Sequence, residues 1–141
     1  MTTVQLLLLP AFLQAALVFF LLSRLARGRV QAVRARKVNP AKAAVDKSQW
    51  PAELRALTNN YENQFELPVL YYAALALIVA TGLADAVAVV LSWLFVASRY
   101  VHSFIQTTDN HLLRRFLAFA SGVTCLMVLW AWLALRLFAI G

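Results

Sequence analysis

Polar side chains recur at helical spacing just ahead of the second apolar segment of the chain. They are Arg55, Asn59, Glu62 and Glu66, separated by 4, 3 and 4 residues. On one continuous helix this spacing places all four on one face, with Asn63 beside them. Such a face points to a specific partner, and a solvated face ahead of an ordinary kink at Pro68 is the competing interpretation.

A second pattern of the same kind lies in the third apolar segment. Its members are Arg99, Ser103, Gln106 and Asn110, with Tyr100 and His102 at neighbouring positions. A charge as deep as Arg99 is costly on a lipid-facing surface, so we expect it to point into the protein and to meet an anion. That anion is either Glu62 or Glu66, in a structural pair, or a bound ligand. Snorkelling of Arg99 to the surface is the alternative.

Further arginines could complete a binding site for an anionic molecule. Together with Arg55 and Arg99, the sequence offers Arg24, Arg27, Arg114 and Arg115. Glu62 would be the embedded counter-charge able to hold an ammonium group, so the set fits a small zwitterion with excess carboxylates. Arg114 and Arg115 taken alone are equally typical of anchors at the membrane interface.

Two other classes of partner are not expected. His102 and His111 stand nine residues apart without a Cys or paired carboxylate at ligand spacing, so no metal site is predicted. Nine of the 13 Lys and Arg residues lie between Arg24 and Arg55, flanked by membrane-length apolar segments. This arrangement is typical of a cytoplasmic loop that attracts anionic lipid headgroups, and no nucleic-acid partner is implied.

The composition requires a bilayer around these residues. The chain of 141 residues is 62% hydrophobic and 13% charged, and four uncharged or nearly uncharged segments are long enough to cross about 30 Å of hydrocarbon. We therefore predict an all-α membrane protein, a four-transmembrane-helix bundle forming one domain over residues 1–141. The expected spans are about 4–23, 65–83, 86–108 and 114–137, with a basic cytoplasmic loop over about 24–50. The second helix is expected to begin near Pro51, and if it runs to Thr81 its length is on the order of 45 Å, beyond the thickness of the hydrocarbon layer.

The distribution of positive charge predicts the orientation. Twelve of the 13 Lys and Arg residues fall on one side of the predicted spans, and only Arg136 falls on the other. Both termini are therefore expected on the non-cytoplasmic side, in a bacterial inner membrane.

The stretch from Arg55 to Asn63 reads Arg-Ala-Leu-Thr-Asn-Asn-Tyr-Glu-Asn and carries a family resemblance. It is similar to the R-x-x-x-N-x-x-E-N/Y signature of the MAPEG family, the membrane-associated proteins of eicosanoid and glutathione metabolism. Four spans, Pro68 after the signature, and Arg99-Tyr100 followed by Arg114 agree with it. The resemblance implies a homotrimer that binds glutathione between subunits and takes a lipophilic co-substrate from the lipid bilayer.

The resemblance also implies roles for individual residues. Glutathione would be held by Arg55, Asn59, Glu62 and Asn63, and faced by Arg99 and Tyr100. Arg114 would be the catalytic residue that stabilises the thiolate, with Arg115 as the alternative. Arg24 would bind a glutathione carboxylate, with Arg27 as the alternative.

Two departures from the leukotriene-forming members leave the activity open. Phe104 stands where those members have a second Tyr, and Glu66 adds an acid near the ligand. We expect a glutathione-dependent transferase or peroxidase acting on lipophilic electrophiles or lipid hydroperoxides. The alternatives are a non-catalytic protein that binds lipid or presents a partner, use of another thiol, and a small transporter.

Overall fold

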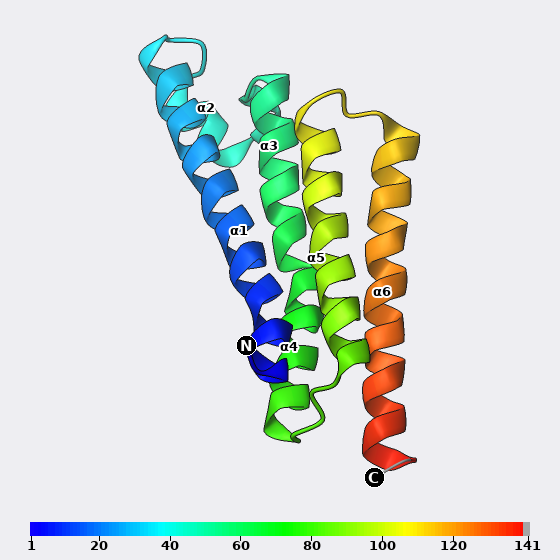
Figure 1. The fold of residues 1–141 in the computed structure, drawn as a ribbon. Coiled ribbons are helices and arrows are strands. Elements are labelled where there is room, and N and C mark those ends of the chain that lie inside the picture. The colour runs from blue at the N-terminus through cyan, green and yellow to red at the C-terminus, as the bar shows by residue number, and fades with distance from the viewer. Residues whose placement is uncertain (140–141) are drawn as a thin grey trace.

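Four long helical segments pack side by side in a computed structural model that describes residues 1–139 (Figure 1). The helices are α1 (Thr3–Arg34), α2 (Pro40–Val45), α3 (Ala52–Glu62), α4 (Leu67–Ala80), α5 (Ala86–Thr107) and α6 (Leu112–Phe138). Two short 3-10 helices, η1 (Lys47–Gln49) and η2 (Asn63–Phe65), precede α3 and α4 respectively. The predicted four-helix membrane bundle is thereby confirmed.

The connections define the two ends of the bundle. The residues between α1 and α3, which include α2, and the turn between α5 and α6 lie at one end, which we call the polar end (Figure 1). Both chain termini and the turn between α4 and α5 lie toward the other end. Each of the four long segments is apolar and long enough to cross a membrane.

The first helix is longer than the sequence predicted. The residues from Arg24 to Arg34 continue α1 as helix, so the expected basic loop over 24–50 contains helix at its start. Their basic composition indicated a loop, but no proline occurs between Arg24 and Asn39 to end the helix. The extension is held against α3 by a 3.2 Å hydrogen bond from Arg29 Nη2 to Thr58 Oγ1.

The second helical segment is interrupted just before Pro68, the residue at which the sequence offered a kink. It consists of α3, η2 and α4, and Glu66 departs from helical geometry with φ −92° and ψ −93°. The break has a physical cause in Pro68, whose ring would clash with the carbonyl group four residues earlier in a regular helix. The polar residues on the two sides of the break, Glu62 and Glu66, therefore do not belong to one continuous helix.

The other helix boundaries follow local capping. Asp85 Oδ1 accepts the backbone N–H of Ala88 at 2.9 Å and thus caps α5. Its Oδ2 accepts the indole N–H of Trp132 on α6 at 3.0 Å, which joins the start of α5 to the end of α6. The helices α5 and α6 begin and end within two residues of the predicted spans.

An apolar core occupies the half of the bundle away from the polar end. Leu7, Tyr71, Phe95 and Leu129 are fully buried there and come from α1, α4, α5 and α6 respectively. Many large apolar side chains on the outside of the same helices remain exposed, including Phe19, Val90 and Met127. This distribution is what a bilayer permits, because lipid chains solvate apolar side chains as well as a protein core does.

Buried amides connect the helices toward the polar end. Gln14 Nε2 donates to Gln64 Oε1 at 3.0 Å, and Gln64 Nε2 donates to Asn60 Oδ1 at 3.0 Å. Asn60 Nδ2 then donates to Ser103 Oγ at 2.8 Å. This chain links α1, η2, α3 and α5 by groups that would each be costly to leave unpaired inside a bilayer, and it holds the helices that carry the candidate site.

Candidate functional site

Two cavities lie at the polar end, and the predicted binding residues are divided between them. The first, of about 400 Å³, lies between α3, α5 and α6 and is called cavity A. It is lined by Asn59, Glu62, Asn63, Glu66, His102, Gln106, Leu112, Arg115, Phe116 and Phe119. The second, of about 580 Å³, is called cavity B and is lined by Arg24, Arg27 and Gln31 of α1 together with residues of α3 and the end of α5.

Cavity A brings together three residues of the predicted signature. Asn59, Glu62 and Asn63 line it because α3 continues without interruption to Glu62 and η2 begins directly after it. Glu66 is also part of the wall, despite the change in backbone geometry at that residue. The wall therefore carries two carboxylates and two amides from one segment of chain.

The opposite wall of cavity A is a hydrogen-bonded chain of side chains. Asn63 Nδ2 donates to Gln106 Oε1 at 3.3 Å, and the same oxygen lies 3.1 Å from His102 Nε2. The other ring nitrogen of His102 lies 3.1 Å from the backbone carbonyl oxygen of Arg115. Both of these oxygens can only accept, so a neutral His102 ring donates to one of them at a time. Asn63 is thereby connected through α5 to the first turn of α6.

Of the two arginines proposed as thiol activators, Arg115 lines cavity A and Arg114 does not. Arg115 Nη1 donates to Asn110 Oδ1 at 2.6 Å. Arg114 Nη1 lies 3.4 Å from Asp109 Oδ2, and the Arg114 side chain is 69% exposed. Both guanidinium groups thus contact the turn before α6, and Arg115 alone of the two also lines cavity A.

Arg99 is buried as the sequence predicted, although its contacts differ from the expected ones. Its side chain has no exposed surface, and Nη2 donates to the carbonyl oxygen of Asn63 at 3.0 Å. Neither Nε nor Nη1 has a hydrogen-bond partner among residues 1–139. No ion pair joins Arg99 to Glu62 or Glu66 within this part of the chain, so its charge remains uncompensated by direct contact.

Arg55 lies outside cavity A and contacts the segment before α3. Its Nη1 donates to the backbone carbonyl oxygens of Ser48 at 3.1 Å and Trp50 at 2.9 Å. The same segment reaches the signature a second time, because Lys47 Nζ lies 2.5 Å from Glu62 Oε1. Two residues of the signature, Arg55 and Glu62, therefore hold η1 and its flanks in place.

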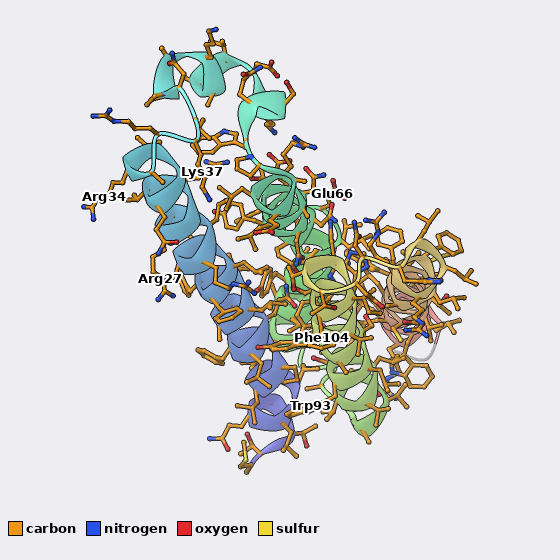
Figure 2. The ribbon with its side chains drawn as sticks, turned by 90° about the horizontal axis from the view of Figure 1, so that it is seen from above. Arg27, Arg34, Lys37, Glu66, Trp93 and Phe104 are labelled. Atoms are coloured by element: carbon orange, nitrogen blue, oxygen red, sulfur yellow. The ribbon has the colours of Figure 1, made fainter. Side chains whose placement is uncertain are left out.

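The remaining predicted residues lie apart from cavity A. Arg24 and Arg27 line cavity B, and Figure 2 shows Arg27 and Glu66 projecting from different sides of the bundle. Tyr100 is partly exposed, and its hydroxyl donates to the carbonyl oxygen of Leu13 on α1 at 2.7 Å. The chain thus brings Asn59, Glu62 and Asn63 together but does not add Arg24, Arg55 or Tyr100 to the same cavity.

Apolar residues complete cavity A on the side of α6. Leu112, Phe116 and Phe119 line it, and Leu112 and Phe116 also border a neighbouring depression with Leu113 and His111. Leu112, Leu113 and Phe116 are each at least 60% exposed. Cavity A, which is polar, therefore adjoins an apolar surface of the kind that faces lipid. An amphipathic molecule could contact both.

Several residues of the site were not identified as such from the sequence. His102 and Gln106 were named only as neighbours of Arg99, and Lys47 was counted only as loop charge. The 4 and 3 spacing of Arg99, Ser103 and Gln106 was the available signal for Gln106. No group of three or more His, Cys, Asp or Glu within residues 1–139 is close enough to hold a metal ion.

Fold and site together define a polytopic membrane protein of four helices with a polar, lipid-adjoining cavity at one end. The sequence model of the MAPEG family matches residues 7–135, and the chain belongs to that family. The family resemblance drawn from the signature is therefore confirmed, and glutathione is the substrate that members of this family generally use. No curated protein and no solved structure matches the chain significantly.

Proposed function

We propose that the protein is a membrane-bound glutathione-dependent transferase or peroxidase that acts on lipophilic electrophiles or lipid hydroperoxides. The observation that carries this proposal is cavity A, which joins the signature residues Asn59, Glu62 and Asn63 to the guanidinium of Arg115 and to apolar side chains of α6. This chemistry requires that a hydrophilic thiol and a lipophilic acceptor bind next to each other. Cavity A offers surfaces suited to each.

The binding of glutathione is argued from charge and hydrogen bonding. Glu62 and Glu66 can hold the ammonium group, and the amides of Asn59 and Asn63 can bond to the peptide groups of the ligand. Arg99, which has two unpartnered nitrogens among the described residues, lies behind Asn63 and supplies positive charge to this part of the protein. The ligand's carboxylates need further cations.

Those cations are available if subunits associate. Arg24 and Arg27 line cavity B, and Arg55 lies on the exposed face of α3. We propose a homotrimer in which cavity B of one subunit faces cavity A of the next, so that both sets of residues contact one glutathione molecule. The exposed faces of α1 and α6 leave apolar surface available for such contacts.

The chemical step requires a thiolate. A free thiol with a pKa of about 8.5 is only about 3% ionised at neutral pH, and an adjacent guanidinium raises that fraction. In the transferase reaction the sulfur forms a bond to an electrophilic carbon, and the leaving group departs with the bonding electrons. In the peroxidase reaction the thiolate takes the terminal oxygen of the hydroperoxide, the O–O bond breaks, and the lipid alkoxide leaves and is protonated to the alcohol. The sulfenic acid formed on the first glutathione then reacts with the thiol of a second glutathione to give the disulfide and water.

Arg114 was the activator expected from the resemblance, with Arg115 as the alternative. The position of Arg115 in the wall of cavity A supports Arg115 within one subunit. The exposed guanidinium of Arg114 supports a role only if it meets the cavity of a neighbouring subunit. The two arginines are therefore the variants to compare.

We place the protein in a bacterial inner membrane with both termini on the non-cytoplasmic side. The support is the distribution of charge, since 12 of the 13 Lys and Arg residues belong to the polar-end half of the chain's helices and connections and only Arg136 lies toward the opposite end. Glutathione would then reach cavity A from the cytoplasm, where it is made.

The test is a stopped-flow ultraviolet difference spectrum of the purified protein mixed with glutathione at neutral pH. The wild type should show thiolate absorbance, and Arg115→Ala should reduce the amplitude by up to about tenfold, the most that the loss of about one unit of pKa shift can cause. Arg114→Ala is the adjacent control. Loss of signal in Arg114→Ala alone would assign the activation to Arg114, and no thiolate in the wild type would contradict the catalytic proposal.

A second candidate is a non-catalytic protein that binds lipid or presents a partner. The observation in its favour is the charge of cavity A, whose wall contains two carboxylates, Glu62 and Glu66, and one guanidinium, Arg115. This balance disfavours an anionic tripeptide unless another subunit adds cations. Lipid that copurifies with the protein, together with no detectable thiolate at any pH, would favour this second candidate.

A further inference from the structure

The acid expected to bind the ammonium group of glutathione already binds an ammonium group of the chain itself. Glu62 lines cavity A, and its Oε1 lies 2.5 Å from Lys47 Nζ in η1. The two residues are 15 positions apart, so the contact folds the segment before α3 back onto the end of that helix. Lys47 is not among the residues that line the cavity, and it approaches Glu62 from outside.

The segment that presents Lys47 is ordered by its own hydrogen bonds. Asp46 accepts the backbone N–H of Ser48 at 2.8 Å, the Ser48 hydroxyl at 2.7 Å and the Gln49 amide at 2.9 Å. These bonds lower the pKa of the Asp46 carboxyl below its usual range, with the Gln49 bond as the largest cause. Lys47 thus extends from a formed 3-10 turn rather than from an unstructured loop.

A second contact attaches this turn to the signature. Arg55 Nη1 donates to the carbonyl oxygens of Ser48 and Trp50, on the C-terminal side of Lys47. The cation and the anion of the signature that are expected to bind the carboxylate and the ammonium of glutathione therefore both hold η1. A zwitterionic ligand offers Glu62 an ammonium group in place of that of Lys47, and it offers Arg55 a carboxylate in place of the two carbonyl oxygens.

We propose that Lys47 is a built-in competitor for the ligand's ammonium group at Glu62, and that η1 is released from the site when glutathione binds. This inference rests on the proposed function, because it assigns Glu62 to the ammonium of the thiol substrate. Lys47 makes the site selective for ligands with a free ammonium group, because a ligand without one leaves Lys47 on Glu62. It also keeps the Glu62 carboxylate neutralised while the site is empty.

The competition is weak enough to be reversed by a ligand. The Lys47 and Glu62 side chains are 70% and 47% exposed, so water and salt screen their attraction. Exposed pairs of this kind contribute little, and releasing Lys47 should change affinity by about two- to fivefold. An ordinary ligand can therefore displace Lys47 without a large loss of affinity.

The experiment measures equilibrium binding of two probes to the full-length protein in detergent. The probes are glutathione and its des-amino analogue, which keeps the thiol and both carboxylates but lacks the ammonium group. The variant is Lys47→Met, and the matched control is Lys42→Met, which removes the same charge from exposed α2 where no carboxylate pairs with it in the described chain. A second background, Glu62→Gln, removes the group for which Lys47 and the ligand compete.

The expected result is that Lys47→Met binds glutathione about two- to fivefold more tightly than the wild type and binds the des-amino analogue unchanged. Lys42→Met should alter neither affinity, and Lys47→Met should have no effect in the Glu62→Gln background. Equal glutathione affinity in the wild type and Lys47→Met, or equal tightening in Lys42→Met, overturns the competitor role alone. No binding of glutathione to the wild type overturns the proposed function and with it this inference.

Discussion

The guanidinium of Arg99 donates a 3.0 Å hydrogen bond from Nη2 to the backbone carbonyl oxygen of Asn63, at the point where α3 gives way to η2. This bond joins α5 to the residue that ends the signature. The other two guanidinium nitrogens of Arg99 are buried without a partner in the described part of the chain. A buried cation with so few contacts is costly, and a ligand that supplies an anion would repay that cost.

The first prediction separates stability from binding at this residue. We expect Arg99→Met to leave the unfolding free energy unchanged or to raise it by about 1 kcal/mol, because replacing a buried, unpaired charge by an apolar side chain is often favourable. Glutathione affinity should fall by about tenfold or more, because the positive charge behind Asn63 is lost. Chemical unfolding and equilibrium binding on the same preparation test both parts. A large loss of stability with unchanged binding would make Arg99 purely structural.

The second prediction compares two adjacent amides on α3. Asn60 is fully buried and donates to the carbonyl oxygen and the hydroxyl of Ser103, whereas Asn59 is exposed and lines cavity A. Asn60→Ala should cost about 1–2 kcal/mol of stability, since it leaves buried groups of Ser103 and Gln64 with fewer partners. Asn59→Ala should leave stability within about 0.5 kcal/mol and weaken glutathione binding.

Denaturant titration and binding of both variants give the measurement. The assignment of Asn60 to the packing of α3 on α5, and of Asn59 to cavity A, would be wrong if Asn59→Ala unfolded at a lower denaturant concentration than Asn60→Ala. It would also be wrong if only Asn60→Ala lost affinity for glutathione.

The third prediction concerns the close approach of α5 and α6. A Cβ atom added at Gly122 would lie 2.6 Å from Ser98 Oγ, which itself donates to the carbonyl oxygen of Phe95. Gly122→Ala should therefore destabilise the protein by about 1–3 kcal/mol through overpacking. Removing the hydroxyl in Ser98→Ala should recover much of that loss, because the added Cβ would then meet Ser98 Cβ at an ordinary 3.6 Å.

Unfolding of the two single variants and the double variant forms a mutant cycle for this contact. We expect the double variant to be more stable than Gly122→Ala alone, which means that the effects of the two substitutions on stability are not additive. Strict additivity would show that the steric conflict lies elsewhere.

The fourth prediction is a pH dependence outside the membrane. Hydrogen bonds from Gln49 and Ser48 lower the pKa of Asp46 from its ordinary value of 3.8. A carboxyl whose pKa is lower in the folded than in the unfolded state contributes stability above the unfolded-state pKa and loses it as the pH falls through the folded-state pKa. The η1 turn should therefore remain formed at neutral pH and loosen only in acid below the ordinary range.

An NMR titration of the Asp46 carboxyl carbon should give a midpoint below that of an unfolded peptide containing the same residues. Asp46→Asn should remove this pH-dependent contribution. A midpoint at or above the ordinary value would mean that the three hydrogen bonds to Asp46 are not maintained in solution.

The sequence predicted those features of the structure that depend on one local property, such as the length of an apolar segment. Four apolar segments of membrane length predicted four spans, because hydrophobic length alone determines whether a helix can cross a bilayer. The signature could be read from spacing, and three of its residues, Asn59, Glu62 and Asn63, do line one cavity. Burial of Arg99 followed from the cost of exposing a charge to lipid.

Other features depend on contacts between helices, which the spacing of residues along the chain does not reveal. Asn60 lies next to Asn59 in the sequence but points to Ser103 of α5, and its importance follows only from how α3 packs on α5. The helical path of α1 beyond Arg24 depends on packing of its basic end against α3, which a composition-based prediction of a loop could not include. The separation of Arg114 from Arg115 depends on where α6 begins, at Leu112, and on its rotation relative to α5.

The break before α4 changes how the protein must fit its membrane. Helix α4 alone has 14 residues and rises about 21 Å, so the second segment crosses the membrane only together with η2 and the end of α3. The break at Glu66 would then lie within the hydrocarbon layer and not at its surface. Backbone and amide groups there have no water to bind, so the hydrogen bonds from Gln14 to Gln64 and from Gln64 to Asn60 replace hydration at the break.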